Sequence, residues 1–324
     1  MAPFGLKWPL DLRKWKWPWS AGSKLATWQR RTLYAAFAAA AFLFALRQTF
    51  PTEAVKERLV MEAAAQGWQL VVTSVEPAGF AGIGMRDVTL QSRDGTRIPI
   101  ERLTAQLELL PLLIGRKSIA FDASLFEGRV KGYAQDGRGA QRLVARLTGV
   151  DLSRAAALRK ATGVDLAGLV SGDVDLTLDA ATPARSAGHL DLAVDRAAVN
   201  GGEMPVPGMA GALTLPKLSL GEVKASATVK DGKLTFDRLE ARSDDVEASG
   251  DGLYLVMQPR LAFAPIFGKA RFRIHDGFWL KPGASSFKGI VEMALAQARG
   301  RDGSYGFQIY GTVGQPQAKM AANL

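Results

Sequence analysis

Two patterns of hydrophobic positions divide the chain. Near its start, fifteen uncharged and mostly apolar residues run without interruption over 32–46. From Trp68 onward, apolar residues instead alternate with polar ones, as Val174, Leu176 and Leu178 do. A continuous apolar run favours a membrane-spanning helix, whereas alternation with a period of two is typical of strands with one wet face.

The apolar run is short for a membrane span. At ~1.5 Å per residue it covers about 22 Å, less than the ~30 Å hydrocarbon core, so its flanks must contribute. A span over 28–50 reaches about 33 Å by the same rise and places aromatic rings near the two interfaces, with arginines reaching toward the headgroups. The predicted anchor residues are Trp28, Arg30, Arg31, Leu33, Phe37, Phe42, Leu46 and Arg47.

Charge sets the predicted orientation. Residues 1–31 carry seven basic side chains and one acidic side chain, a net charge of +6 out of the chain's +10. The positive-inside rule leaves this tail in the cytoplasm and exports the rest. A cleaved signal peptide is the competing interpretation, but its charged region would be unusually long and no small-x-small site follows the apolar run. The sequence thus predicts a cytoplasmic tail (1–31), a transmembrane anchor (32–50) and an exported domain (51–324).

Two features of the N-terminal part each allow two interpretations. Five of the seven tryptophans lie in the tail, three of them interleaved with Lys16 and Pro18. Indole rings and lysines suit an anionic membrane surface, but Pro9 and Pro18 interrupt any long helix, so a tail that touches nothing is equally compatible. In the anchor, Ala36 and Ala40 form a small-x-x-x-small pair that lets a second helix approach, although alanine-rich runs contain such pairs by chance.

The exported part is predicted to consist of antiparallel strands and two short helices. The first helix covers 52–66, because Pro51 precedes it and Gly67 can end it, and the second covers 153–161. Asp-Gly pairs supply hairpin turns between alternating runs. The clearest alternating runs are 173–179, 188–195, 222–230, 269–275 and 305–313, and the Asp-Gly pairs begin at Asp94, Asp136, Asp231 and Asp302.

The alternation predicts one apolar face that needs a cover. Segments 172–178 and 188–194 share a loose template, which a solenoid or the hairpins of a meander would both produce. A one-sided sheet must hide its apolar face by curling, with a second sheet, or with something outside the chain. We expect a mainly β fold, in which the transmembrane helix precedes a large, antiparallel, curled sheet, half-open or sandwich-like. The predicted apolar face comprises Val174, Leu176, Leu178, Leu190, Leu192, Phe307 and Ile309.

Composition removes several classes of function. The part of the chain after the tail (32–324) carries a net charge of only +4, because the tail holds +6 of the chain's +10, so nucleic-acid binding loses its main support. Cysteine is absent, which excludes disulfide bonds and thiol catalysis. Burial and strand pairing alone must then hold the fold.

Residues that could carry catalysis or bind metal are sparse and badly spaced. His189 and His275 occupy polar positions of alternating strands, so we expect both to face solvent. No pair of His, Asp or Glu has a zinc-site spacing, and neither a Gly-x-Ser-x-Gly elbow nor a Walker sequence is present. We expect no enzyme activity and no catalytic, cofactor-binding or metal-binding residue. Two further groups are predicted to be turns. The glycines could suggest a phosphate-binding loop and the acidic residues a calcium loop, but neither group has the required spacing. The groups are Gly79, Gly82 and Gly84, and Asp244, Asp245, Glu247 and Asp251.

Four segments of the chain, taken in order, carry a resemblance to a known family. They are 50–51 with the helix that follows; 109–116 (LLPLLIGR) with 121–123 and 126–130; 149–153 with 172–176; and 302–307 with Gly311, Thr312 and Pro316. Together they cover almost the whole exported chain and resemble the type II secretion system protein N family in its longer, anchored form, while the Trp-rich tail has no counterpart in the family. The family is in turn similar to AsmA-like envelope proteins, whose half-open curled sheets present an apolar interior.

The resemblance implies a non-enzymatic accessory or scaffold subunit of the type II secretion machinery, with other secretion-system subunits as partners. It would sit in the bacterial inner membrane as a single-pass protein, its N-terminus cytoplasmic and its bulk periplasmic. The AsmA-like similarity implies instead a groove that holds phospholipid and serves envelope lipid transport or homeostasis. An exposed apolar groove wide enough for acyl chains favours the groove, and a closed, packed interior favours the scaffold. A periplasmic enzyme is a third class that lacks any acid-base or nucleophile constellation.

Overall fold

The computed structural model of the chain divides into two units, Met1–Phe50 and Pro51–Leu324. The residues that it describes are 32–34, 36–38, 41, 51–65, 68–79, 81–92, 97–108, 111–112, 115–137, 139–156, 158–159, 163–179, 181–205, 212–258, 263–281 and 284–322.

In the first unit, the described residues 32–34 and 36–38 are helical. The side chains of Leu33 and Phe37 are 55% and 73% exposed, and Ala36 is exposed as well. Among the described residues, no helix combines the length and the apolar character needed to cross a membrane. The predicted tail (1–31) and the other predicted anchor and helix-contact residues lie outside the described residues: Trp28, Arg30, Arg31, Ala40, Phe42, Leu46 and Arg47.

The second unit is mainly β. Its strands are β1 (Trp68–Ala78), β2 (Gly82–Ser92), β3 (Arg97–Leu107), β4 (Lys117–Leu125), β5 (Gly128–Asp136), β6 (Gln141–Asp151), β7 (Val164–Leu178), β8 (Ala187–Pro205), β9 (Ala212–Leu215), β10 (Leu218–Lys230), β11 (Lys233–Arg242), β12 (Val246–Val256), β13 (Ile266–Ile274), β14 (Tyr305–Thr312) and β15 (Gln315–Met320).

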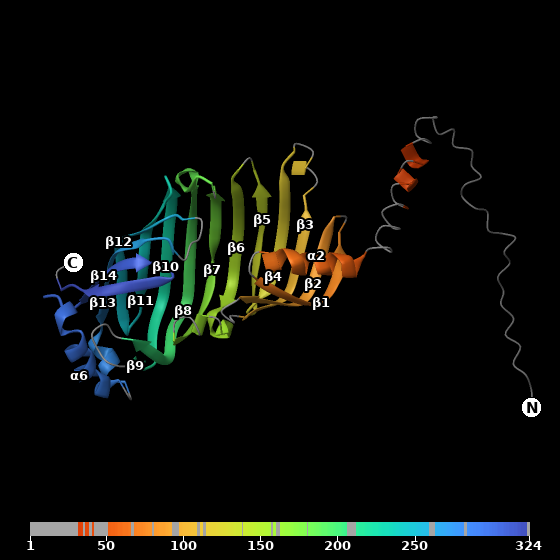
Figure 1. Ribbon diagram of the computed structural model, residues 1–324. Coiled ribbons are helices and arrows are strands. Elements are labelled where there is room, and N and C mark those ends of the chain that lie inside the picture. Colours follow the sequence, from red (N-terminus) through yellow and green to blue (C-terminus); the bar gives the residue numbers. More distant parts are fainter. Residues whose placement is uncertain are drawn as a thin grey trace, which may run out of the picture. The chain divides into compact units, whose positions relative to one another are not determined.

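All these strands belong to one antiparallel sheet whose order follows the chain (Figure 1). Fourteen of them form the path from β1 to β15, and the short β9 pairs with the end of β8. Because β1 and β15 are the two ends of this path and do not pair with each other, the sheet is not closed. The predicted antiparallel strands are confirmed, each within one observed strand or shifted by one residue at its end.

The helices are few and short. They are α2 (Thr52–Ala65), α5 (Asp276–Trp279) and α6 (Ser285–Ala294), with single 3-10 turns at η3 (Leu152–Arg154), η4 (Pro183–Arg185) and η6 (Ala296–Ala298). The first predicted helix is confirmed as α2. At the second, η3 begins beside Asp151, whose carboxylate accepts the Ser153 N–H at 2.9 Å, and only parts of 155–162 lie among the described residues.

The prediction of only two short helices is wrong, because α5, α6 and η6 lie between β13 and β14. The sequence of this segment contains Pro282 and Gly289, and both residue types disfavour helix, although Gly289 lies inside α6. The helical signal is the four-residue spacing of Phe287 and Val291, which pack together with the buried Phe278.

Two of the four predicted turns join neighbouring strands. Asp231 and Gly232 have positive φ angles of 52° and 71° and join β10 to β11, as a tight turn of primed type requires. Asp136 begins a longer loop between β5 and β6. The tight turn predicted at Asp302 is present and is closed by the antiparallel bridge between Arg299 and Tyr305, but it joins η6 to β14 and not two strands. Asp94 lies outside the described residues.

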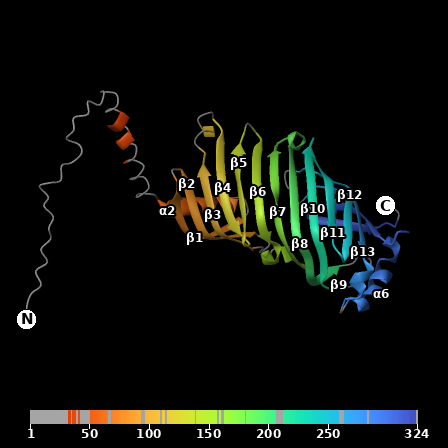
Figure 2. The same ribbon diagram turned by 180° about the vertical axis from the view of Figure 1, so that it is seen from behind.

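The first buried cluster lies between α2 and the first four strands. Val72 and Val88 are 4% and 1% exposed at its centre, and Val55 and Leu59 of α2 pack against it. Figures 1 and 2 both place α2 beside β1 to β4. The N-terminal end of the apolar face is therefore covered by a helix.

Two further clusters bury the C-terminal part of the sheet. One gathers on β10, β11 and β12 around Ala227 and Val229, with Ala264 from the segment before β13 completely buried against it. The other consists of Phe278, Trp279 and the start of α6, and packs against β10 and β13. The two ends of the sheet are thus better covered than its middle.

Candidate functional site

Three rows of apolar side chains cross the sheet at right angles to the strands. Residues directly opposite each other in an antiparallel pair point to the same face, so the register traces each row from β3 to β10. We call these three rows the apolar floor. The rows are Leu107, Ile119, Ala134, Leu143, Leu176, Gly188 and Val229; Ala105, Phe121, Gly132, Ala145, Val174, Leu190 and Ala227; and Leu103, Ala123, Val130, Leu147, Gly172, Leu192 and Ala225.

The floor is large enough to hold an extended hydrocarbon chain. Neighbouring strands lie about 4.8 Å apart, so the seven strands from β3 to β10 give it a length of about 29 Å. Adjacent rows are two residues apart along a strand, and at ~3.3 Å per residue three rows have a width of about 13 Å. Because several positions of the middle row are glycine or alanine, the side chains of that row project little from the sheet.

The middle of the floor has no cover among the described residues. Ile119 is 46% exposed, and Ala134 beside it is exposed as well. Six further floor residues on β4 to β8, all with side chains larger than alanine, are half-buried and belong to none of the three buried clusters. An apolar surface of this extent is unusual on a face that is exposed to water, and it marks a binding surface. The six residues are Phe121, Val130, Leu143, Leu147, Val174 and Leu192.

All seven residues predicted for the apolar face are half-buried and point to one face. Four of them lie on the floor itself, and Leu178 follows Leu176 at the end of β7. Phe307 continues the floor's third row on β14, where its ring stacks on Phe272 with centroids 5.7 Å apart. The predicted set omits the floor residues of β4 to β6. On β6, the apolar Val144 between Leu143 and Ala145 interrupts the alternation of apolar and polar residues, so the sequence signal for this strand is weak.

The opposite face of the same strands is charged. Arg129 pairs with Asp122 at 2.6 Å, Arg142 with Asp175 at 2.7 Å, and Arg146 with Asp173 at 2.6 Å, all between neighbouring strands. Hydrogen bonds from arginine lower the pKa values of Asp122 and Asp175 below their ordinary range. Since these pairs are largely exposed, each adds little stability, but together they keep this face in water.

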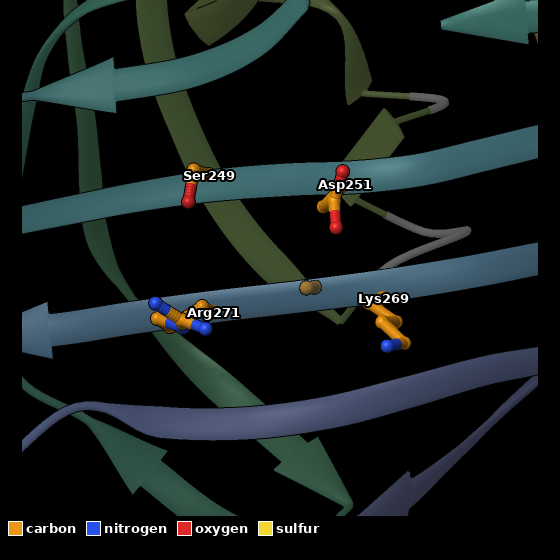
Figure 3. Close-up of a pocket in the computed structure, with 5 residues that line it drawn as sticks. Ser249, Asp251, Lys269 and Arg271 are labelled. Atoms are coloured by element: carbon orange, nitrogen blue, oxygen red, sulfur yellow. The ribbon is translucent and has the colours of Figure 1, made fainter. Parts of the chain in front are cut away.

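The polar face also carries two shallow hollows. One, of about 180 Å³, is lined by Ser249 and Asp251 of β12, which lie opposite Arg271 and Lys269 of β13 (Figure 3). The other, of about 380 Å³, spans β7, β8, β10 and β11. Both hollows contain serine together with aspartate and lysine, but among the described residues no serine of either hollow donates a hydrogen bond to a carboxylate there. The second hollow is lined by Ser171, Gly172, Asp173, Asp191, Leu192, Ala193, Lys224, Ala225, Ser226 and Arg238.

Neither histidine takes part in a catalytic arrangement among the described residues. His189 is exposed on β8, opposite Asp175 and Thr228. His275 directly follows the last residue of β13 and is half-buried, so it is less exposed than His189. No group of three or more His, Asp or Glu side chains in the described part of the chain could hold a metal ion.

The residues predicted to form simple turns behave differently. Gly79 lies in the turn after β1 with a φ of 64°, whereas Gly82 and Gly84 belong to β2. The acidic group is not a solvated turn as a whole. Glu247 and Asp251 belong to β12, and Asp245 is only 1% exposed. Burial of a carboxylate requires partners that the local sequence does not reveal.

Asp245 obtains its partners from distant segments. Lys281, just after α5, approaches it at 2.6 Å, and the Ser219 N–H donates to it at 3.0 Å. Burial alone would raise the pKa of Asp245, but these hydrogen bonds and the charges of Lys281 and His275 lower it below its ordinary value. The arrangement attaches the helical segment to the sheet and is structural rather than catalytic.

Comparison of the chain with protein-family models, with curated proteins and with solved structures finds no match. The type II secretion and AsmA-like resemblances are therefore neither supported nor contradicted by known proteins.

Proposed function

We propose that this protein binds phospholipid by its acyl chains on the apolar floor, and that it serves lipid transport or homeostasis in the bacterial envelope. The observation that carries the proposal is the uncovered middle of the floor, between two ends that are covered by the chain itself. In this proposal the sheet is curled and half-open, the first unit anchors it in the inner membrane, and the sheet lies in the periplasm.

The hydrophobic effect supplies the affinity. Each buried methylene contributes about 0.8 kcal/mol, so a single acyl chain along one row offers several kcal/mol even when only part of it is covered. The three rows of the floor contain no charged residue, and the arginine and aspartate pairs lie on the opposite face. A ligand with a long apolar chain and a headgroup that stays in water fits this division.

A photo-crosslinker placed on the floor tests the proposal. We expect p-benzoylphenylalanine at Phe121 to form an adduct with phospholipid in bacterial cells labelled with radioactive phosphate, because Phe121 lies in the middle row of the uncovered floor. The labelled adduct is measured on a denaturing gel after lipid extraction.

The matched control is the same crosslinker at Ala120. This residue is the neighbour of Phe121 on β4 and points to the polar face, opposite Gln106 and Tyr133. We expect little phosphate label there. Equal labelling at both positions, or none at Phe121 while the protein is folded and irradiated to completion, contradicts a lipid-binding floor.

A scaffold role in type II secretion is the second proposal. Besides the ordered resemblance, it is favoured by β1, an eleven-residue strand that, among the described residues, pairs only with β2 and offers its other edge to a partner strand. Another secretion-system subunit could add a strand there. This role involves no turnover of a substrate.

For this second proposal we expect deletion of the gene to impair release of exoproteins across the outer membrane. Alanine at His189 or His275 should leave secretion nearly unchanged, since neither histidine belongs to a catalytic arrangement among the described residues. Secretion is measured as exoprotein activity in the culture medium. Normal secretion in the deletion strain, together with altered outer-membrane lipid, would leave only the lipid-binding proposal.

A further inference from the structure

The loop between β3 and β4 has an apolar sequence but lies at the rim of the sheet. Its sequence from 109 to 114 is LLPLLI, and Gly115, Arg116 and Lys117 follow. Of the apolar residues, Pro111 and Leu112 are among those described, and the Leu112 side chain is 43% exposed. Arg116 and Lys117 are exposed as well.

Hydrogen bonds hold the base of this loop in one conformation. The Glu108 N–H donates to the Ser118 carbonyl at 2.9 Å, and the Ser118 hydroxyl donates to the Glu108 carboxylate. Nearer the tip, the Gly115 N–H donates to the Leu112 carbonyl and the Arg116 N–H to the Pro111 carbonyl, both at 3.0 Å. These hydrogen bonds tie Leu112 to Gly115 and Pro111 to Arg116.

The chemistry of the loop fits a membrane surface better than a protein surface. Exposed leucine next to cations is the combination that inserts into the headgroup region, where apolar side chains enter the acyl layer and lysine or arginine meets anionic phosphates. A protein partner would more often be met by aromatic anchors, and residues 108–117 contain none. Charge complementarity thus favours an anionic lipid bilayer as the occupant.

The base of the loop opens directly onto the apolar floor. Leu107 ends β3 and lies opposite Ile119 on β4, and these two residues are the first two of the row nearest the rim. Ile119 in turn lies opposite Ala134, which is exposed. An acyl chain leaving a bilayer at Leu112 would therefore meet Ile119 and then the uncovered middle of the floor.

We propose that the β3–β4 loop inserts into an anionic membrane surface and is the place where lipid passes between the bilayer and the floor. The passage of lipid rests on the proposed lipid-binding function, whereas the membrane contact stands without it. The loop acts through Leu112, Arg116 and Lys117, with Leu107 and Ile119 as the first apolar contacts beyond it.

The absence of cysteine allows the membrane contact to be measured in the full chain. A Leu112→Cys variant carries an environment-sensitive fluorophore, and the protein is reconstituted in phosphatidylethanolamine–phosphatidylglycerol vesicles containing a nitroxide-labelled lipid. We expect most of the fluorescence at position 112 to be quenched. The matched control is Ala140→Cys in the polar loop between β5 and β6, which lies at the same rim and should keep its fluorescence.

A second set of variants in the same quenching experiment reverses two charges of the loop. Arg116→Glu and Lys117→Glu, introduced together into the labelled Leu112→Cys protein, should reduce quenching in these vesicles and have a smaller effect in phosphatidylcholine vesicles. Unquenched fluorescence at position 112 overturns the membrane contact, as does equal quenching at positions 112 and 140. A blue-shifted emission that the lipid quencher does not reduce indicates burial by protein and also overturns it.

The crosslinker at Phe121 separates this inference from the proposed function. If Leu112→Glu abolishes the phosphate-labelled adduct at Phe121, the loop is the route of entry. If the adduct persists in that variant, lipid reaches the floor by another route and the inference fails while the function stands. If no adduct forms even in the parent protein but position 112 is quenched, the lipid-binding function fails and the membrane contact remains.

Discussion

Replacing Leu143 with aspartate is expected to remove the phosphate-labelled adduct at Phe121 almost completely. Leu143 lies in the row nearest the rim, between Ala134 and Leu176, where the floor is uncovered. A carboxylate there would have to lose water beside an acyl chain, which costs several kcal/mol, and each ~1.4 kcal/mol lowers binding about tenfold. The adduct is measured with the crosslinker at position 121 in the same cells.

The neighbouring position supplies the control for this change. Val144 points to the polar face, where it lies opposite Tyr133 and Asp175. We expect Val144→Asp to leave the adduct unchanged, because the floor is intact. An adduct that survives Leu143→Asp, or that disappears equally in both variants, would show that the row nearest the rim does not hold the ligand.

Replacing Lys281 with methionine is expected to lower the free energy of unfolding by about 2 kcal/mol, the cost of leaving a buried charged acceptor with one partner fewer. The Asp245 side chain is 2% exposed, and Lys281 approaches it at 2.6 Å while remaining half-exposed itself. The unfolding midpoint in urea measures the loss. Lys288→Met on α6, another exposed lysine, is the control and should change stability little.

The loss of stability caused by Lys281→Met should depend on pH in one direction. Because the folded-state pKa of Asp245 is lowered, its ion pair contributes stability that is fully present above the ordinary carboxyl pKa of about 3.9 and is lost as the pH falls through the folded value. The difference between the parent protein and Lys281→Met should therefore be largest near neutral pH and vanish in strong acid. A difference that grows in acid would mean that Asp245 is not the partner that matters.

The strands were predictable because their signal is local. Alternation with a period of two fixes which residues share a face, and the Asp231-Gly232 turn fixes the register of β10 against β11. The apolar face around Leu176 and Leu192 could be predicted in the same way. The helix α2 was equally accessible, since a proline and a glycine mark its ends.

The parts that escaped prediction depend on contacts between distant segments. The local sequence predicts that Asp245 belongs to an exposed acidic turn. In the structure it is buried beside Lys281, which lies thirty-six residues later in the chain. The helices α5 and α6 contain breaking residues and are held by packing of Phe278 and Trp279 against the sheet. Where the floor is covered and where it is open follows from α2 and from the segment around Ala264, and no local pattern contains that information.

The strand order has a consequence for how such a sheet can change in length. Among the described residues, each strand from β1 to β7 pairs only with its neighbours in the chain, as repeats do in a solenoid, so stability is close to a sum of nearest-neighbour terms. Insertion or loss of one hairpin would lengthen or shorten the three rows by two strands, about 10 Å, without disturbing the faces of the others. Duplication of hairpins is therefore a simple evolutionary route by which proteins of this architecture could span gaps of different width.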